Sequence, residues 1–231
     1  MSRPALSIII PTYNALPELA NCLAALVSGL SAGLVREAIV VDGSSTDDSA
    51  HLAADMGCTT IIMAPNARGR GAQLSAGAQA SKGSWLLFLH ADTVLHENWV
   101  SVVHSHIAKA PAKAAFFKLA FQQSGRGPRR VAALANWRAR TFGLPYGDQG
   151  LLISRELYDQ VGGFAQLALM EDVDFVVRLG RRRLIGLECV ACTSGAKYEH
   201  GGWWALPLRN LMLLGAFLMG VKPAILAKWY R

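Results

Sequence analysis

Short polar clusters follow four apolar segments in the first half of the chain, and their side chains are of the types that bind nucleotides and metal ions. The clusters are Pro11-Thr-Tyr-Asn14, Asp42-Gly-Ser-Ser45, Asn66 to Gly71, which includes Arg68 and Arg70, and His90-Ala-Asp-Thr93. Carboxylates accept hydrogen bonds from a base or ribose or hold a divalent cation, and arginine pairs with phosphate. Any single cluster is ordinary turn chemistry, but four in succession indicate the rim of a ligand site.

The apolar segments before these clusters are typical of strands, and helical patterns lie between them. The predicted strands are residues 6–10, 38–41, 60–63 and 85–89. Apolar residues recur at helical spacing over 16–30, Thr46 is placed to cap a second helix, and a third fits 72–80. Strands that are apolar on both faces belong in a sheet covered by helices on both sides. We therefore predict an α/β fold with a mostly parallel sheet, whose ligand lies at the carboxyl ends of the strands.

The second half of the chain is less regular and carries further acidic residues. We expect strands at 114–121, 151–154 and 184–191 and helices at 129–141 and 171–178. The last helix begins with Glu171 and Asp172, where the helix dipole favours carboxylates. Before the strand at 151–154, Gly147-Asp-Gln-Gly150 forms a turn.

Composition and charge narrow the class of protein. Of the 231 residues, 52% are hydrophobic and 17% charged, which excludes a disordered chain. The formal charge of +7 favours an anionic partner, such as nucleic acid, an acidic membrane or a phosphorylated small molecule. Because the basic residues are not interleaved with stacking aromatics, we expect no nucleic-acid partner. Four cysteines do not make a disulfide scaffold in a chain this long, so reduced thiols in a cytoplasm fit best.

Taken in order, the motifs resemble those of family 2 glycosyltransferases of the GT-A fold. They are Ser7-Ile-Ile-Ile-Pro-Thr-Tyr-Asn14, Ile39-Val-Val-Asp-Gly-Ser-Ser-Thr-Asp-Asp48, Arg70-Gly-Ala-Gln-Leu-Ser-Ala-Gly77, Phe88-Leu-His-Ala-Asp92, Gly147-Asp-Gln-Gly150 and Met170-Glu-Asp-Val-Asp174. The chain looks most like the compact bacterial branch called "transferase 2, radical-SAM/selenodomain-associated". The resemblance implies transfer of a sugar from a nucleotide-sugar to an acceptor, with inversion at the anomeric carbon.

The resemblance also implies roles for individual residues. Those expected to bind the nucleotide-sugar are Pro11, Thr12, Tyr13, Asp42, Ser44, Arg68, Arg70 and Asp92. Asp92 matches the last carboxylate of the D-x-D motif, which binds the diphosphate through Mn²⁺ or Mg²⁺. Asp172 matches the general base and Glu171 its neighbour. Asp148 and Gln149 would lie beside the donor sugar or the acceptor.

These roles agree with what the reaction requires. A diphosphate leaves only if its developing charge is neutralised, which a metal ion or arginines can do. An acceptor hydroxyl is a poor nucleophile, so a carboxylate within hydrogen-bond reach must take its proton. One acidic group at the sheet edge and one across the cleft would meet both demands, as Asp92 and Asp172 could.

One departure from the family pattern concerns the metal ion. His90 stands where the first Asp of D-x-D is usual. Imidazole suits Mn²⁺ or Zn²⁺ better than Mg²⁺, and His90 is equally able to hydrogen-bond the ribose. His200 lies where some related enzymes supply a further ligand, so the candidate metal ligands are Asp92 and His200.

The C-terminal segment, 203–231, differs from the predicted glycosyltransferase domain at 1–202. Its apolar residues cover every face of a helix, and basic and aromatic residues follow them near the end. Its longest uncharged apolar run, 211–221, is too short to span a membrane. The pattern fits a helix packed on its own domain, on a second subunit in a homodimer, or on a membrane surface. We accordingly expect a cytoplasmic protein that is either free or peripheral at the inner membrane face.

Two other functions compete with the glycosyltransferase. A nucleotidyltransferase would share the nucleotide-binding half, but it needs a Gly-rich first loop with a Lys, which Pro11-Thr-Tyr-Asn14 lacks. A non-catalytic nucleotide- or membrane-binding module is favoured by the incomplete motif at His90. The presence of Asp92, Glu171 and Asp172 argues against such a module.

Overall fold

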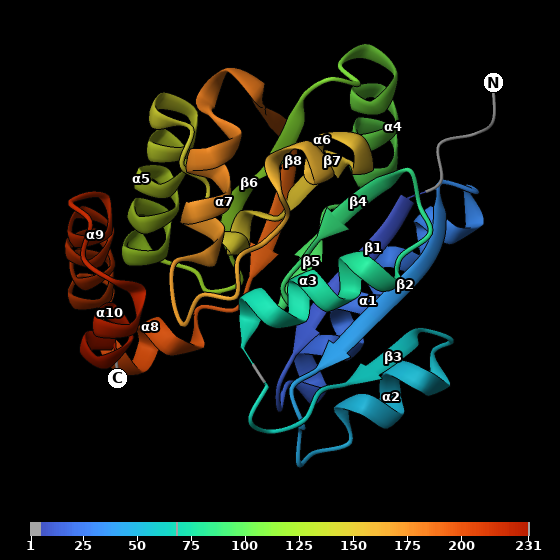
Figure 1. Ribbon diagram of the computed structural model, residues 1–231, viewed down its shortest axis with the longest axis horizontal. Coiled ribbons are helices and arrows are strands. Elements are labelled where there is room, and N and C mark those ends of the chain that lie inside the picture. Colours follow the sequence, from blue (N-terminus) through green and yellow to red (C-terminus); the bar gives the residue numbers. More distant parts are fainter. Residues whose placement is uncertain (1–5, 68, 231) are drawn as a thin grey trace.

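The computed structural model describes residues 6–67 and 69–230, which form a mixed eight-stranded sheet with helices on both faces (Figure 1). The strand order is β3-β2-β1-β4-β7-β6-β8-β5. The strands are β1 (Leu6–Thr12), β2 (Val35–Asp42), β3 (Thr59–Ile62), β4 (Trp85–Phe88), β5 (Thr93–Leu95), β6 (Ala114–Phe121), β7 (Leu151–Ser154) and β8 (Leu184–Thr193).

The helices alternate with the strands in the first half and gather at the end of the chain. They are α1 (Leu16–Ser31), α2 (Ser49–Asp55), α3 (Arg70–Ala80), α4 (Trp99–Lys109), α5 (Arg126–Phe142), α6 (Arg155–Val161), α7 (Glu171–Leu179), α8 (Ala196–Gly201), α9 (Ala205–Leu218) and α10 (Pro223–Tyr230). Short 3₁₀ turns lie at Gly147–Gln149 and Arg181–Arg183.

The sheet has a parallel half and a mixed half. Strands β1 to β4 run parallel to one another, as the sequence predicts. Strand β7 is antiparallel to both β4 and β6, and β5 is antiparallel to β8, whereas β6 and β8 are parallel. The prediction of an α/β sheet is confirmed, and its regular parallel part ends at β4.

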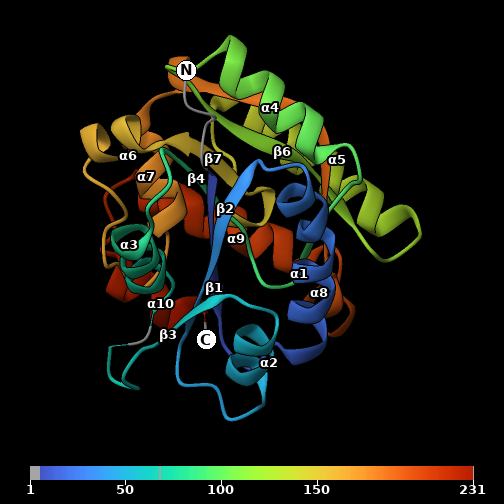
Figure 2. The ribbon, with the colours of Figure 1, turned by 90° about the vertical axis from the view of Figure 1, so that its right-hand side faces the viewer.

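The uninterrupted apolar runs arise because each central strand is covered on both faces. In β1, Ile8 and Ile10 pack in one core with residues of α1 and α4, and Ile9 packs in a second core with residues of α3 and α7. Figure 2 shows α1 and α3 on opposite sides of the strands. Helix α3 approaches β1 closely at Gly77, where a Cβ atom would lie 2.4 Å from Cγ2 of Ile9.

Two predicted helix starts differ from the structure. Thr46 does not cap α2, which begins at Ser49, because the preceding segment is tied to the loop after β1: the Thr46 amide donates to Asn14 Oδ1 at 2.8 Å. Helix α5 begins at Arg126 rather than at residue 129. Its first turn packs against Trp203, where a Cβ on Gly127 would lie 2.9 Å from Cγ of the indole.

The last two helices pack on the domain through part of their apolar surface. Leu213, Leu214 and Leu226 are buried in one cluster with Met170 and Val173, which lie at the start of α7. Other apolar side chains of α9 remain exposed. None of the helices within 6–67 and 69–230 combines the length and apolar character needed to cross a membrane.

Candidate active site

The polar cleft lies at the carboxyl ends of β1, β4 and β8 and consists of two adjoining cavities. The larger, of about 430 Å³, is bordered by the loop after β1 and the start of α1. The smaller, of about 160 Å³, is bordered by the turn at 147–149, the start of α7 and α8. Both cavities are lined by Arg70, His90, Asp92, Ser194 and Lys197. The shared wall makes one continuous site from the parallel half of the sheet into the mixed half.

The larger cavity is lined by five of the residues predicted to bind a nucleotide-sugar. Pro11, Thr12 and Tyr13 line it together with Asp92 and Arg70. The shape of this wall depends on Gln73, whose buried amide donates to the carbonyl oxygens of Thr12, at 2.9 Å, and Val41, at 2.8 Å. Gln73 therefore holds the ends of β1 and β2 at the edge of the cavity.

Two other predicted nucleotide-binding residues, Asp42 and Ser44, do not line the larger cavity. Asp42 is buried, and its two oxygens accept from the amide of Ser45, at 2.7 Å, and from its hydroxyl, at 2.5 Å. The hydroxyl of Ser44 donates to the carbonyl oxygen of Met63. Both side chains thus stabilise the loop after β2. Arg68 lies outside the described residues.

Arg70 joins α3 to the acidic start of α7. Its guanidinium pairs with Glu171 and, at 3.5 Å, with Oδ2 of Asp172. Burial lowers the pKa of Arg70, but the two carboxylates outweigh this effect and raise the pKa above its usual value. Glu171 is only 2% exposed and Asp172 14%. Burial raises the pKa of Glu171 against the attraction of Arg70. Glu171 is thus a buried partner of the arginine and lines neither of the two cavities.

The Asp172 carboxylate lines the smaller cavity and is held in place by its neighbours. Its Oδ2 accepts from the Gly147 amide at 2.8 Å, and its Oδ1 accepts from the Val173 amide at 2.8 Å. A Cβ on Gly147 would lie 2.6 Å from Nε2 of His90, so only glycine fits this contact. Met170, just before α7, has a φ of 66°, an uncommon conformation for a side chain of its size. Its packing in the C-terminal cluster holds this turn.

Asp148 and Gln149 lie one after the other in the 3₁₀ turn but have different surroundings. Asp148 lines the smaller cavity, and its buried Oδ1 has no hydrogen-bond partner among the described residues. Burial raises its pKa to about 6. Gln149 is buried, and its amide donates to the Phe117 carbonyl oxygen at 3.1 Å and to Oδ1 of Asn136 at 3.3 Å. Gln149 therefore anchors the turn, outside the residues that line either cavity.

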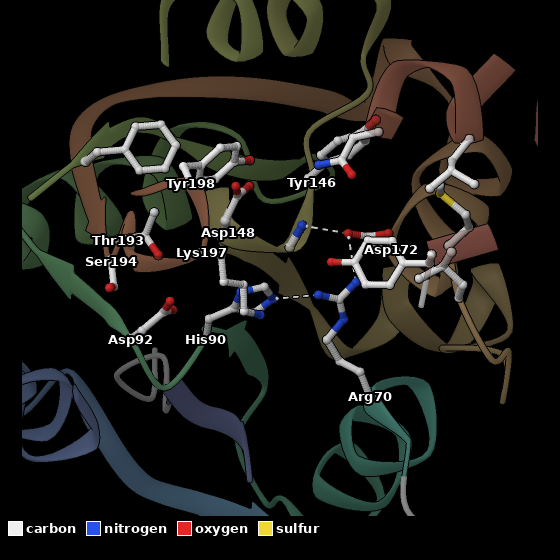
Figure 3. Close-up of a pocket in the computed structure, with 17 residues that line it drawn as sticks. Arg70, His90, Asp92, Tyr146, Asp148, Asp172, Thr193, Ser194, Lys197 and Tyr198 are labelled. Carbon is white, nitrogen blue, oxygen red and sulfur yellow. Dashed lines mark hydrogen bonds and ion pairs between the residues drawn. The ribbon is translucent and has the colours of Figure 1, made fainter. Parts of the chain in front are cut away.

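Asp92 lies across the smaller cavity from Asp172, with His90 and Arg70 between them (Figure 3). Burial raises the pKa of Asp92, while a hydrogen bond from Thr193 and the charge of Lys197 act in the opposite direction. Burial and the nearby Arg70 lower the pKa of His90 to about 3, so its imidazole is neutral. The cleft thus sets two carboxylates on opposite walls, with the Arg70 cation and the neutral His90 between them.

The possible metal ligands around Asp92 fit one mode of metal binding. In the part of the chain that the structure describes, no three His, Cys, Asp or Glu side chains gather as an all-protein metal site. Mg²⁺ commonly binds instead through one or two carboxylates and the phosphates of the substrate, keeping several waters. Asp92 suits that mode. The side chain of His200, the second predicted ligand, lies outside the described part of the structure.

Several lining residues were not among the predicted site residues. Lys197 borders both cavities, and Tyr146 and Tyr198 border the smaller one. Lys197 follows the end of β8, the same topological position as the clusters after the first four strands, and that position could have indicated it. Tyr146 lies directly before the Gly147 turn, but no pattern in the sequence predicts that its side chain lines the cleft.

Relatives in sequence are glycosyltransferases by name. A "PGL/p-HBAD biosynthesis glycosyltransferase" of Mycobacterium bovis is 35% identical over 101 residues, which are 42% of this chain and 39% of that protein. An "uncharacterized glycosyltransferase" of Haemophilus influenzae is 27% identical over 185 residues, 75% of this chain and 61% of that protein. The chain therefore matches less than two thirds of the length of either relative.

Solved structures show the same fold. The mannosyltransferase PcManGT from Pyrobaculum calidifontis, in complex with GDP-Man and Mn²⁺, has a TM-score of 0.69 at 18% identity over 100% of this chain and 70% of that one. S. aureus TarS in complex with UDP-GlcNAc has a TM-score of 0.63 at 18% identity over 83% of this chain and 56% of that one. The GT-A type of fold predicted from the motifs is confirmed.

The family model for glycosyl transferase family 2 matches residues 7–167, a stretch that contains both the strand-end clusters and the Gly147 turn. That match covers more than half of the sequence and includes strands from both halves of the sheet. The chain belongs to glycosyl transferase family 2.

Proposed function

We propose that the protein is an inverting glycosyltransferase that moves a sugar from a nucleotide-sugar to an acceptor hydroxyl. The observation that carries the proposal is the continuous cleft with Asp92 on one wall, Asp172 on the other, and Arg70 and Lys197 beside them. This arrangement supplies cations for a diphosphate and a separate carboxylate for a hydroxyl proton. Membership of family 2 supports the same reaction.

The donor would bind across the two cavities. The larger one, with Pro11, Thr12 and Tyr13, has room for the base and ribose, and Arg70 and Lys197 lie where the two cavities meet, near the expected diphosphate. Asp92 would hold a Mn²⁺ or Mg²⁺ ion together with the phosphate oxygens. When bound, that ion would neutralise charge on the leaving diphosphate. Neighbouring structures that contain GDP-Man with Mn²⁺, or UDP-GlcNAc, support this class of donor.

The chemical step would be a single displacement. The acceptor oxygen forms a bond to the anomeric carbon while the bond from that carbon to the diphosphate oxygen breaks, and the nucleoside diphosphate leaves with the electron pair. Asp172 takes the proton of the acceptor hydroxyl. Attack on the face opposite the leaving group inverts the anomeric carbon. Glu171, paired with Arg70, keeps the arginine between the two carboxylates, and Gln149 holds the turn that carries Asp148.

The C-terminal segment enters the proposal as an extension packed on the domain of residues 1–202. The cluster of Leu213, Leu214 and Leu226 with Met170 and Val173 supports this packing. Homodimer formation, peripheral contact with a membrane through 203–231 and a cytoplasmic location stay predictions. Sedimentation with vesicles, compared between the full chain and one ending near Gly202, tests the membrane contact.

Thermal unfolding with UDP, GDP and dTDP, each with and without Mn²⁺, tests the donor site. A ligand at a hundred times its Kd adds about 2.7 kcal/mol, which raises Tm by roughly 5–11 °C in a chain of this size. We expect a metal-dependent rise with one nucleotide, and no rise in Asp92→Ala. If no nucleotide raises the Tm of the wild type, the chain is not a transferase of this donor class.

A further inference from the structure

An apolar groove lies between α5 and α9, which both lie at one edge of the molecule in Figure 1. Its volume is about 510 Å³. Helix α5 contributes Leu134, Trp137 and Phe142, and α9 contributes Leu208, Leu211 and Leu218. All six of these side chains are exposed to solvent. Monomeric proteins rarely leave contiguous apolar surface of this kind uncovered unless it binds something.

The groove is continuous with the candidate active site. Tyr146, Asp148, Tyr198 and Asn210 line both the groove and the smaller cavity of the cleft. A molecule in the groove would therefore reach Asp148, in the same cavity as Asp172, without crossing open solvent. This continuity distinguishes the groove from an apolar patch elsewhere on the surface.

Polar atoms at the junction of groove and cleft lack partners. Tyr146 Oη, Asp148 Oδ1 and Arg138 Nη2 are buried, and none has a hydrogen-bond partner within the described ranges. Buried polar groups are nearly always hydrogen-bonded, so a set of three next to one another points to a ligand with a polar end at this place. The groove is thus apolar along its length and polar where it meets the cleft.

We propose that the groove binds the hydrocarbon chain of the acceptor, so that the acceptor is an amphiphile whose hydroxyl lies at the Asp148 end. The inference rests on the proposed function, because it names the second substrate of the same site. The order of parts in such a lipid, a chain followed by a polar head, matches the order of apolar and polar lining from α9 to the cleft. Arg130 lies over the ring of Trp204, a groove residue, at 5.6 Å and adds positive charge at the rim.

A bilayer surface or a second copy of the chain would cover the exposed face of α9 more broadly. Met212 and Met219 are exposed on α9 and just after it, and neither lines the groove. A flat partner would bury them along with Leu208 and Leu211, whereas a single chain in the groove would leave them in water. Substitutions on the two sides of α9 therefore distinguish a single chain in the groove from a flat partner that covers the whole face.

The experiment measures quenching of tryptophan fluorescence by ω-bromoalkanols, from bromohexanol to bromoundecanol, below their aggregation concentrations. Trp137 and Trp204 line the groove and would report a bromine that enters it. The variants are Leu208→Gln and Leu211→Gln, each 59% exposed, and the matched control is Met212→Gln, which is 67% exposed on the same helix. The nucleotide-induced rise in Tm is recorded on every variant, so that failure of the donor site is seen separately.

We expect saturable quenching whose affinity rises about fourfold for each added methylene, from the free energy of burying a CH₂ group. Each groove variant should bind about tenfold more weakly and Met212→Gln as the wild type does. The proposal is overturned if quenching does not saturate, if affinity does not depend on chain length, or if Met212→Gln weakens binding as much as Leu211→Gln. Normal quenching with no nucleotide response would overturn the proposed function instead.

Discussion

The parallel half of the sheet and the mixed half contribute to the cleft in different ways. In the parallel half, polar side chains at or beside the strand ends hold the backbone: Gln73 of α3 joins the ends of β1 and β2, and Asp42 holds the loop that follows it. In the mixed half, Asp148 and Asp172 come from a turn and a helix start and face the smaller cavity. The difference suggests that the first half sets the shape of the donor site, while the second supplies the groups that act on the acceptor.

Among these predictions, substitution of Arg70, which joins the two halves of the site, should have the largest effect. Arg70→Gln would leave Glu171 buried without its cation, which should lower the free energy of unfolding by about 3 kcal/mol. Denaturant unfolding measures the loss. The double variant with Glu171→Gln should recover most of it, because the buried charge is then gone. Arg140→Gln, at the exposed pair with Glu188, is the control and should change stability by less than about 1 kcal/mol.

Gly147 tests how closely the turn of the mixed half must approach the parallel half. In Gly147→Ala the new methyl group would meet His90 and displace the amide that holds Asp172. Misplacement of a catalytic group by about 1 Å costs on the order of a hundredfold in rate. The rate is measured as release of the nucleoside diphosphate from the donor. Gly215→Ala, on α9 with open space around it, should keep the wild-type rate; an equal loss there would contradict this explanation.

The raised pKa of Asp148 gives the mixed half a pH dependence of its own. Its pKa of about 6 lies above the value of 3.8 for an unperturbed Asp. The folded state therefore binds the proton more tightly, and the stabilisation present below about pH 4 is lost as pH rises through about 6. We expect the free energy of unfolding of the wild type to fall by about 2 kcal/mol over this interval relative to Asp148→Asn. Parallel curves for the two proteins would show that Asp148 is not perturbed.

Gln73 probes the parallel half alone. Gln73→Leu would leave the carbonyl oxygens of Thr12 and Val41 without their donor, at a cost of about 1–2 kcal/mol. Because the ends of β1 and β2 would loosen, nucleotide affinity should fall as well. Titration calorimetry measures that affinity. Gln79→Leu, at an exposed position of the same helix, is the control and should change neither quantity.

The same comparison explains what could be predicted from the sequence. The strand-end clusters follow a repeated topological rule, so the α/β fold and a ligand rim with Arg70 and Asp92 could be read from spacing alone. Whether a polar side chain at a strand end faces the ligand or its own loop depends on local hydrogen bonds. Asp42 and Ser44 were expected to bind the nucleotide, and their partners are Ser45 and Met63.

The mixed half could be predicted less well, because its contacts join residues far apart in the chain. The pairing of Glu171 with Arg70 joins residues 101 positions apart, and it buries the carboxylate expected beside the general base. The groove beside Asp148 needs α5 and α9 to meet, which no periodicity in either helix specifies. The apolar character of the C-terminal segment was clear, but its burial against Met170 was one of three alternatives.

The division of roles across the cleft is the central claim, and paired measurements on Asp92→Asn and Asp172→Asn test it most directly. For each variant, nucleotide affinity is measured by calorimetry with Mn²⁺, and donor turnover by release of the nucleoside diphosphate. We predict that Asp92→Asn loses nucleotide affinity, while Asp172→Asn keeps it and loses turnover by about 10²–10⁴-fold, the usual contribution of a general base. If Asp172→Asn turned over donor at the wild-type rate, or lost nucleotide affinity as Asp92→Asn does, the two walls of the cleft would not have separate roles.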